Sequence, residues 1–251
     1  MNVIRVTVGR GWGWIVEGWR LFAKAPGIWL LIMLIYLGIS MVLSFIPFLG
    51  PLAYALLAPV LAGGMLYGAA ALDRGESLEI GHLFQGFKDQ DRMGPLVVLG
   101  LISLAAGALM VLVMFVFMGG GLLLGGALDY TGAVVPPESM GGVFAGFGLI
   151  AFLIVLAISF LVAMALFYGV PLVMLAGRYA WPAIQDSITA CWINFLPLLV
   201  FGLIYFVLGI VAIIPFGLGF LVLGPVTAGA IYASYREVFQ GQARPSINLA
   251  K

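Results

Sequence analysis

Six long runs of apolar residues dominate the sequence and restrict the folds that it can adopt. Each run approaches or exceeds the ~20 residues that an α-helix needs to cross the roughly 30 Å hydrocarbon core of a bilayer. The runs are 27–46, 52–72, 96–118 (or 128), 143–176, 198–214 and 216–235. Only 8% of the 251 residues are charged, against about 25% in ordinary soluble domains. The sequence therefore predicts an all-α membrane bundle, with residues 1–251 as a single membrane domain.

The positive charges lie outside these runs, in segments that six spans would place on one side of the membrane. These are Arg5, Arg10, Arg20, Lys24, Arg74, Lys88, Arg92, Arg178, Arg236, Arg244 and Lys251. The opposite side would carry only Asp129 and Glu138. Basic residues favour the cytoplasmic side of a membrane. We therefore expect both termini to be cytoplasmic.

The chain also contains signs of an internal repeat, with approximate copies at 10–77, 78–179 and 180–243. Residues 95–102 match 197–204 at six of eight positions, and 59–63 match 225–229 at four of five. Each copy reads as an amphipathic segment, a proline and two spans that form a hairpin. The hairpin tips are expected at 47–51 and 215–217, with an irregular cap at 119–142. Such parallel repeats differ from the inverted repeats of many ion-coupled transporters.

Aromatic residues recur at helical spacing in the segments before each hairpin. They are Trp12, Trp19, Phe22, Phe84, Phe87, Trp181 and Trp192. Aromatic side chains concentrate at membrane–water interfaces, and amphipathic helices lie in that plane. We therefore expect three interfacial helices anchored at the cytoplasmic headgroup level.

Three prolines fall at similar places within the second, fourth and sixth runs: Pro59, Pro171 and Pro225. Proline removes a backbone hydrogen bond and bends a helix. A shared bend would open a central crevice, which tyrosines would line. These are Tyr36, Tyr67, Tyr168, Tyr205 and Tyr232. The alternative is that the tyrosines anchor the spans at the interface.

The polar segment 73–92 is the one place where the sequence offers groups for chemistry. Glu79 and His82 could share a helix face, and Asp89 with Asp91 could bind a divalent cation. The alternative is a solvated connection, because His82 and Cys191 are the only histidine and cysteine and zinc sites take three or four ligands. We therefore predict no catalytic, cofactor or metal site.

A resemblance rests on 83–87 (Leu-Phe-Gln-Gly-Phe) and on Pro59 with Gly63 four residues later. These motifs resemble a family of bacterial six-helix inner-membrane proteins of uncharacterised function. The chain is also distantly similar to the membrane domain fused to some glycerophosphodiester phosphodiesterases. The resemblance implies a bacterial inner-membrane location and brings no catalytic residue. We do not expect the phosphodiesterase activity, because we find no counterpart of that soluble domain.

These observations leave three hypotheses for function. The first is a non-enzymatic membrane protein that engages membrane lipids, a membrane-protein partner or a second copy of itself. The second is a transporter or channel for an uncharged or amphipathic solute. The third is an enzyme that acts on lipid headgroups at the cytoplasmic face, through the segment 73–92. A net charge of +1 gives no reason to expect nucleic acid as a partner.

Overall fold

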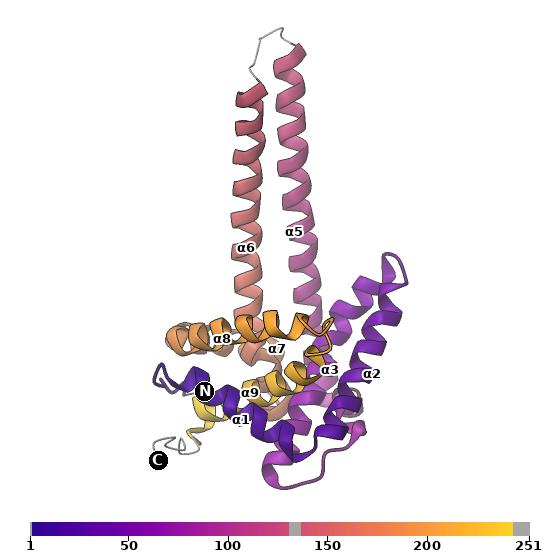
Figure 1. The fold of residues 1–251 in the computed structure, drawn as a ribbon, viewed down its shortest axis with the longest axis vertical. Coiled ribbons are helices and arrows are strands. Elements are labelled where there is room, and N and C mark those ends of the chain that lie inside the picture. The colour runs from indigo at the N-terminus through magenta and orange to yellow at the C-terminus, as the bar shows by residue number, and fades with distance from the viewer. Residues whose placement is uncertain (1, 131–136, 243–251) are drawn as a thin grey trace. The chain divides into compact units, whose positions relative to one another are not determined.

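The computed structural model describes residues 2–130 and 137–242. Most of these residues are helical and none lies in a strand, which confirms the all-α prediction. The elements are α1 (Arg10–Lys24), α2 (Pro26–Ser44), α3 (Leu49–Arg74), the 3₁₀ helix η1 (Ile80–Phe84), α4 (Gln85–Lys88), α5 (Gln90–Tyr130), α6 (Pro137–Ala176), α7 (Ala180–Ile193), α8 (Phe195–Ile213) and α9 (Phe220–Gln240). Three times along the chain, short helical elements precede two longer helices (Figure 1).

Local sequence explains several helix ends. Proline stands at the first position of α2, where a missing N–H costs nothing and φ is already helical. Helix α3 ends at Gly75 and α9 at Gly241, both in the left-handed conformation. Glycine adopts that conformation without strain.

Five helical segments in the described residues are long and apolar enough to cross a membrane. They are α2, α3, residues 90–120 of α5, residues 146–176 of α6, and α8. This confirms the multi-span character predicted from the sequence. Helix α9 is not among them, because its last turns carry charged residues. The stretch 119–142, expected to be irregular, is helical up to Tyr130 and from Pro137 onward, whereas 131–136 lie outside the described residues.

The chain divides into two compact units, one of Met1–Leu101 with Met164–Lys251 and one of Ile102–Ala163. The second unit consists of the adjoining parts of α5 and α6. Its surface is strongly apolar, with Phe115 and Leu123 about three-quarters exposed. The hydroxyl of Ser159 donates to the carbonyl of Val155 at 2.7 Å. Internally satisfied polar groups and outward apolar groups are what a lipid environment requires.

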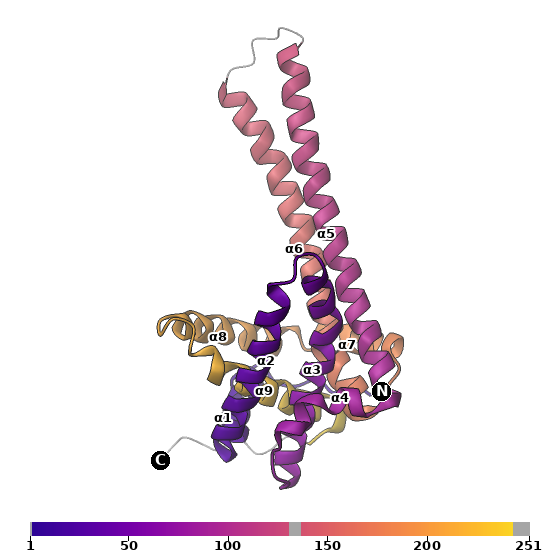
Figure 2. The ribbon, with the colours of Figure 1, turned by 90° about the vertical axis from the view of Figure 1, so that its right-hand side faces the viewer.

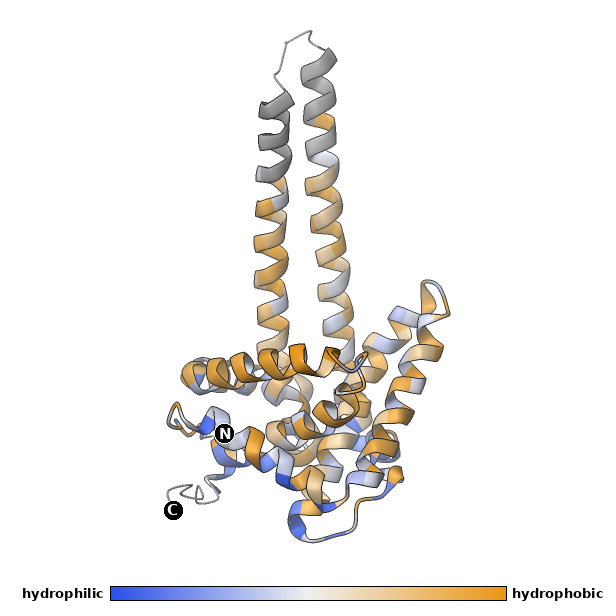
Figure 3. Cartoon of the chain, viewed as in Figure 1, coloured by the Kyte–Doolittle hydropathy of each residue, from blue (hydrophilic) through white to orange (hydrophobic). Residues whose placement is uncertain are grey.

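In the first unit, α1 packs across α9 and α8, and α3 packs on η1, α4 and α9 (Figures 1 and 2). Trp14 and Trp29 are fully buried in its core. The Lys24 ammonium donates to the carbonyl of Leu72 at 2.7 Å and joins the end of α1 to α3. Figure 3 shows α8 as an almost continuous apolar helix, with hydrophilic residues on α1 and in the loop after α3. The candidate site therefore lies around α1.

Candidate functional site

Helix α1 buries Glu17 against the protein and turns two of its three tryptophans outward. Glu17 is 8% exposed, whereas Trp12 and Trp19 are 51% and 54% exposed. The rest of the buried face is apolar, with Trp14, Leu21 and Phe22 in the core, as in other amphipathic helices. The two exposed tryptophans are the part of α1 that favours apolar surroundings on its outer side.

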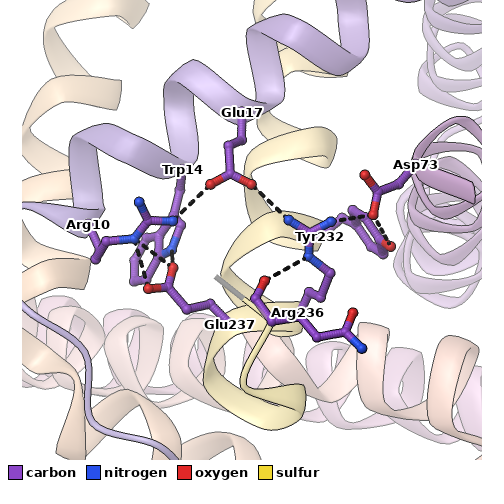
Figure 4. Close-up of polar contacts among 8 residues, drawn as sticks. Arg10, Trp14, Glu17, Asp73, Tyr232, Arg236 and Glu237 are labelled. Atoms are coloured by element: carbon purple, nitrogen blue, oxygen red, sulfur yellow. Dashed lines mark hydrogen bonds and ion pairs between the residues drawn. The ribbon is translucent and has the colours of Figure 1, made fainter. Parts of the chain in front are cut away.

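The buried side of α1 begins an ion-pair network (Figure 4). Glu17 accepts from Arg10 at 2.8 Å and from Arg236 of α9 at 3.0 Å. The Nε of Arg10 donates to both carboxylate oxygens of Glu237 at 2.8 Å. The indole N–H of Trp14 donates to the same carboxylate at 2.7 Å. Burial lowers the pKa of Arg10, but its bonds to the two carboxylates raise it overall.

The network continues to α3 through Asp73. Arg236 forms an ion pair with Asp73, and the hydroxyl of Tyr232 donates to that carboxylate at 3.1 Å. Arg236 also donates to the backbone carbonyl of Gln242 at 3.1 Å. Removing one member of such a buried pair leaves its partner's charge uncompensated, which costs about 3–5 kcal/mol. The network therefore fixes α1, α3 and α9 together.

A small cavity of about 10 Å³ adjoins the network, and Arg20 lines it beside Glu17 and Asp73. That volume is close to the minimum that one water molecule needs. The three carboxylates of the network outnumber its two guanidinium groups, and the charge of Arg20 restores the balance. The cluster is suited to structural pairing and has no room for an organic substrate.

The sequence analysis missed this network. It placed Arg236 outside the last span and did not single out Glu17, whereas both are buried. A usable signal was present: Arg10 and Glu17 are seven residues apart, which places them on one face of a helix, and Trp14 lies between them on the same face. Their partners on α9 are distant in sequence and could not be identified.

The outer side of α1 borders an apolar groove of about 650 Å³. Helix α1 contributes Trp12, Ile15, Val16 and Trp19, and nine further lining residues come from α8, α9 and the turn between them. None of the lining residues is charged. The groove can therefore hold a hydrocarbon chain and offers no group for chemistry on one.

The groove lies within a triangle whose three sides are α1, α8 and α9, and close contacts at glycines hold the corners together. A Cβ on Gly11 would lie 2.4 Å from the Pro197 carbonyl of α8, and one on Gly18 would lie 2.2 Å from a carbonyl of α9. Helix α1 therefore crosses both legs of the α8–α9 hairpin, at points about 10 Å apart along its axis. At the tip the legs converge, since a Cβ on Gly219 would lie 2.5 Å from the Cα of Ala212.

The residues of the predicted crevice have varied partners in the structure. Tyr36 hydrogen-bonds to Tyr54 at 2.8 Å, and the ring of Tyr67 lies 5.3 Å from His82. Tyr168 is fully buried, Tyr205 stacks on Phe201, and Tyr232 belongs to the network. Pro59, Pro171 and Pro225 are all buried. The apolar groove includes none of these eight residues, and the crevice stays a prediction.

The predicted interfacial aromatics differ in exposure. Trp181 and Trp192 of α7 are exposed, as Trp12 and Trp19 are. Phe84 and Phe87 are half-buried, with ring centroids 6.4 Å apart. Phe22 is buried in the core of the first unit, so its contribution there is packing.

The polar segment 73–92 forms local contacts. The Glu79 backbone N–H donates to the Nδ1 of His82 at 3.3 Å, and the two residues form a capping box for η1. Asp89 pairs with Arg92 at 2.6 Å. The described residues include no group of three or more potential metal ligands.

Comparison of the chain with family models, with curated proteins and with solved structures finds no match. Function therefore has to be argued from the network and the groove themselves, because a fold alone does not imply a function.

Proposed function

We propose that this chain is a non-enzymatic, multi-pass membrane protein that engages lipid, with one acyl chain held in the groove beside α1. The observation that carries the proposal is the groove's uniformly apolar lining next to two exposed tryptophans. Its volume lies within the range of about 300–1,000 Å³ that is typical of ligand pockets.

The surroundings of the groove favour lipid as its occupant. Helix α8 forms one wall, and its other exposed residues include Leu203 and Phe206. The groove therefore continues into a surface suited to hydrocarbon. Each methylene removed from water contributes about 0.8 kcal/mol, but a chain that enters from the bilayer gains packing contacts instead. Shape complementarity would then decide which chains bind.

The finer arrangement belongs to the same proposal. Three hairpins, each following an interfacial helix, would sit in a bacterial inner membrane with both termini in the cytoplasm. The order of elements supports this reading, as does the one-sided distribution of basic residues. The outward tryptophans of α1 support its place at the headgroup level.

Native mass spectrometry of the protein released from nanodiscs tests the lipid proposal. Leu208 lines the groove, so Leu208→Trp should obstruct it and lower retained phospholipid several-fold. Leu203 is exposed on the same helix and is not a lining residue, so Leu203→Trp is the matched control and should retain lipid normally. Equal retention by the two variants and the unaltered chain would contradict the proposal.

Transport of an uncharged or amphipathic solute is a second candidate. Prolines inside α3, α6 and α9 favour it, because proline bends a helix and such bends can act as hinges. Reconstituted vesicles should then move a fluorescent single-chain lipid, and Leu208→Trp should slow that movement. Binding without movement would leave lipid engagement as the function. The third hypothesis, a headgroup enzyme, relied on Glu79, His82 and Asp89. The capping box and the ion pair with Arg92 give these residues structural roles instead.

A further inference from the structure

The turn between α8 and α9 holds a bulky residue in a conformation that bulky residues avoid. Phe216 has φ +54° and Gly217 has φ +81°, and the N–H of Leu218 donates to the carbonyl of Pro215 at 3.1 Å. Two positive φ values inside such a hydrogen-bonded turn indicate type I′ geometry, which favours Asn-Gly. Phenylalanine is strained there, and its side chain is 100% exposed.

The residues around Phe216 are apolar as well. Ile213, Ile214 and Leu218 are each more than 60% exposed, and no charged residue occurs from 187 to 235. A turn that emerges into water usually carries Asn, Asp or Gly at its strained positions. Contact with hydrocarbon is favourable for an exposed apolar turn of this kind.

Helix α8 provides a first measure of how deep this turn lies. Gly11 of α1 contacts α8 at Pro197 and Phe201, so that part of α8 is level with α1. Pro215 is 14 residues beyond Phe201, which corresponds to at most about 21 Å along a helix. The hydrocarbon core is about 30 Å thick, so the turn stops short of the far side.

Helix α2 provides a second measure. It begins at Pro26, directly after α1, and a Cβ on Gly224 of α9 would lie 2.7 Å from the sulfur of Met33. Met33 is seven residues into α2, and Gly217 is seven residues from Gly224. The two stretches together span about 21 Å at the rise of a helix, and remain under about 30 Å even if the three turn residues before α9 are extended.

We infer that α8 and α9 form a re-entrant hairpin, which enters the bilayer from the cytoplasmic side and returns with Phe216 inside the hydrocarbon. The inference rests on the proposed placement of α1 at the headgroup level and not on lipid binding in the groove. It keeps both termini on one side. Helix α9 is not among the segments long and apolar enough to cross, although α8 by itself is.

The first hairpin offers a matched comparison. Its tip residue, Phe48, also has a positive φ of 62° and is 87% exposed. However, Pro26 and Ile46 are 20 residues apart, or about 30 Å of helix. That length reaches the far boundary of the hydrocarbon. Phe48 and Phe216 should therefore differ in depth, although their turns are alike in chemistry.

Single-cysteine labelling tests the inference in a Cys191→Ala background. The variants are Phe216→Cys, Leu218→Cys as a second tip probe, Phe48→Cys, and Gln240→Cys as an exposed cytoplasmic control. A membrane-impermeant maleimide should react with neither third-hairpin variant from either side of sealed membranes, and with both after detergent is added. Gln240→Cys should react from the cytoplasmic side alone.

A nitroxide attached to each variant then reports depth through its power saturation. The labels at 216 and 218 should be accessible to oxygen and protected from a water-soluble nickel chelate, and the label at 48 should lie closer to the extracytoplasmic headgroups. Maleimide labelling of Phe216→Cys or Leu218→Cys from either side would overturn the inference. If Leu208→Trp and Leu203→Trp retained lipid equally while positions 216 and 218 stayed protected from the maleimide, only the proposed function would be overturned.

Discussion

Gly18 of α1 and Gly229 of α9 meet backbone to backbone. A Cβ on Gly229 would lie 2.9 Å from the Cα of Gly18, and a Cβ on Gly18 would lie 2.2 Å from the carbonyl oxygen of Val226. Small residues allow this approach between helices where lipid reduces the hydrophobic drive to associate. The contact sets the position of α1 over the α8–α9 hairpin, and hence the base of the groove.

Gly18→Ala should separate α1 from α9. We expect it to lower the free energy of unfolding by about 1–3 kcal/mol, the usual cost of overpacking. Gly38→Ala in α2 is the control, because a Cβ there meets nothing within 4 Å, and alanine favours a helix over glycine by about 0.5–1 kcal/mol. Unfolding in mixed micelles measures both variants, and equal effects would refute the close-contact interpretation.

Glu17→Gln should be strongly destabilising because it leaves Arg10 and Arg236 short of a buried carboxylate. We expect a loss of about 3–5 kcal/mol. Glu76→Gln is the control: it removes the exposed pair with Arg74, and exposed pairs contribute up to about 1 kcal/mol. Combining Glu17→Gln with Arg236→Gln should cost less than the sum of the single variants. Additive losses would argue against a coupled network.

Cys191 should be unreactive in the folded protein. It is buried on α7, its thiol lies 3.6 Å from the Met164 carbonyl, and burial raises its pKa to about 12. Because the thiolate is the reactive form, a permeant maleimide at pH 7.5 should label it only after denaturation. Gln240→Cys in the Cys191→Ala background is the control, because Gln240 is exposed and the reagent should label a cysteine there in the folded protein.

The capping box of η1 should weaken in acid. Burial is the main cause that lowers the pKa of His82, assisted by Lys88 and Arg74 and opposed by Glu79 and Glu76. The folded state therefore favours the neutral ring. The pKa of histidine in an unfolded chain is about 6.5, so the neutral His82 ring makes its full contribution to folding stability above that pH. The contribution declines as the pH falls further, because the unfolded chain then binds the proton more readily than the folded chain does.

Hydrogen exchange at residues 80–84 measures this effect at pH 8 and pH 5.5, after correction for the intrinsic rate. Protonation also removes the lone pair with which Nδ1 accepts the Glu79 N–H. His82→Asn keeps an acceptor and does not titrate in this range, so its protection should not change. Equal pH dependence in the two chains would contradict the role of His82.

The helices could be predicted from sequence where length and hydropathy decide the structure. The run 198–214 corresponds to α8, Phe195–Ile213, because proline at 215 stops it. The predicted sixth run began at residue 216, whereas α9 begins at Phe220, since the backbone of Phe216 and Gly217 takes positive φ values. Local sequence does not reveal that strain, because phenylalanine is unfavourable there.

The candidate site was much harder to predict. A helical pattern places Glu17 on a face but does not say whether that face meets water or protein. The answer depends on Arg236, whose contact with Glu17 joins positions 219 residues apart. The groove likewise depends on where α1 crosses α8 and α9, which single glycines decide.

The pairing of Arg10 with Glu237 links positions 227 residues apart. At about 5–20 residues per second of synthesis, roughly 10 to 45 s separate the emergence of these two residues from the ribosome. Until then, Arg10 and Glu17 have each other as partners but lack Glu237 and Arg236 of α9. We therefore expect the docking of α1 on α9 to be a late step in folding.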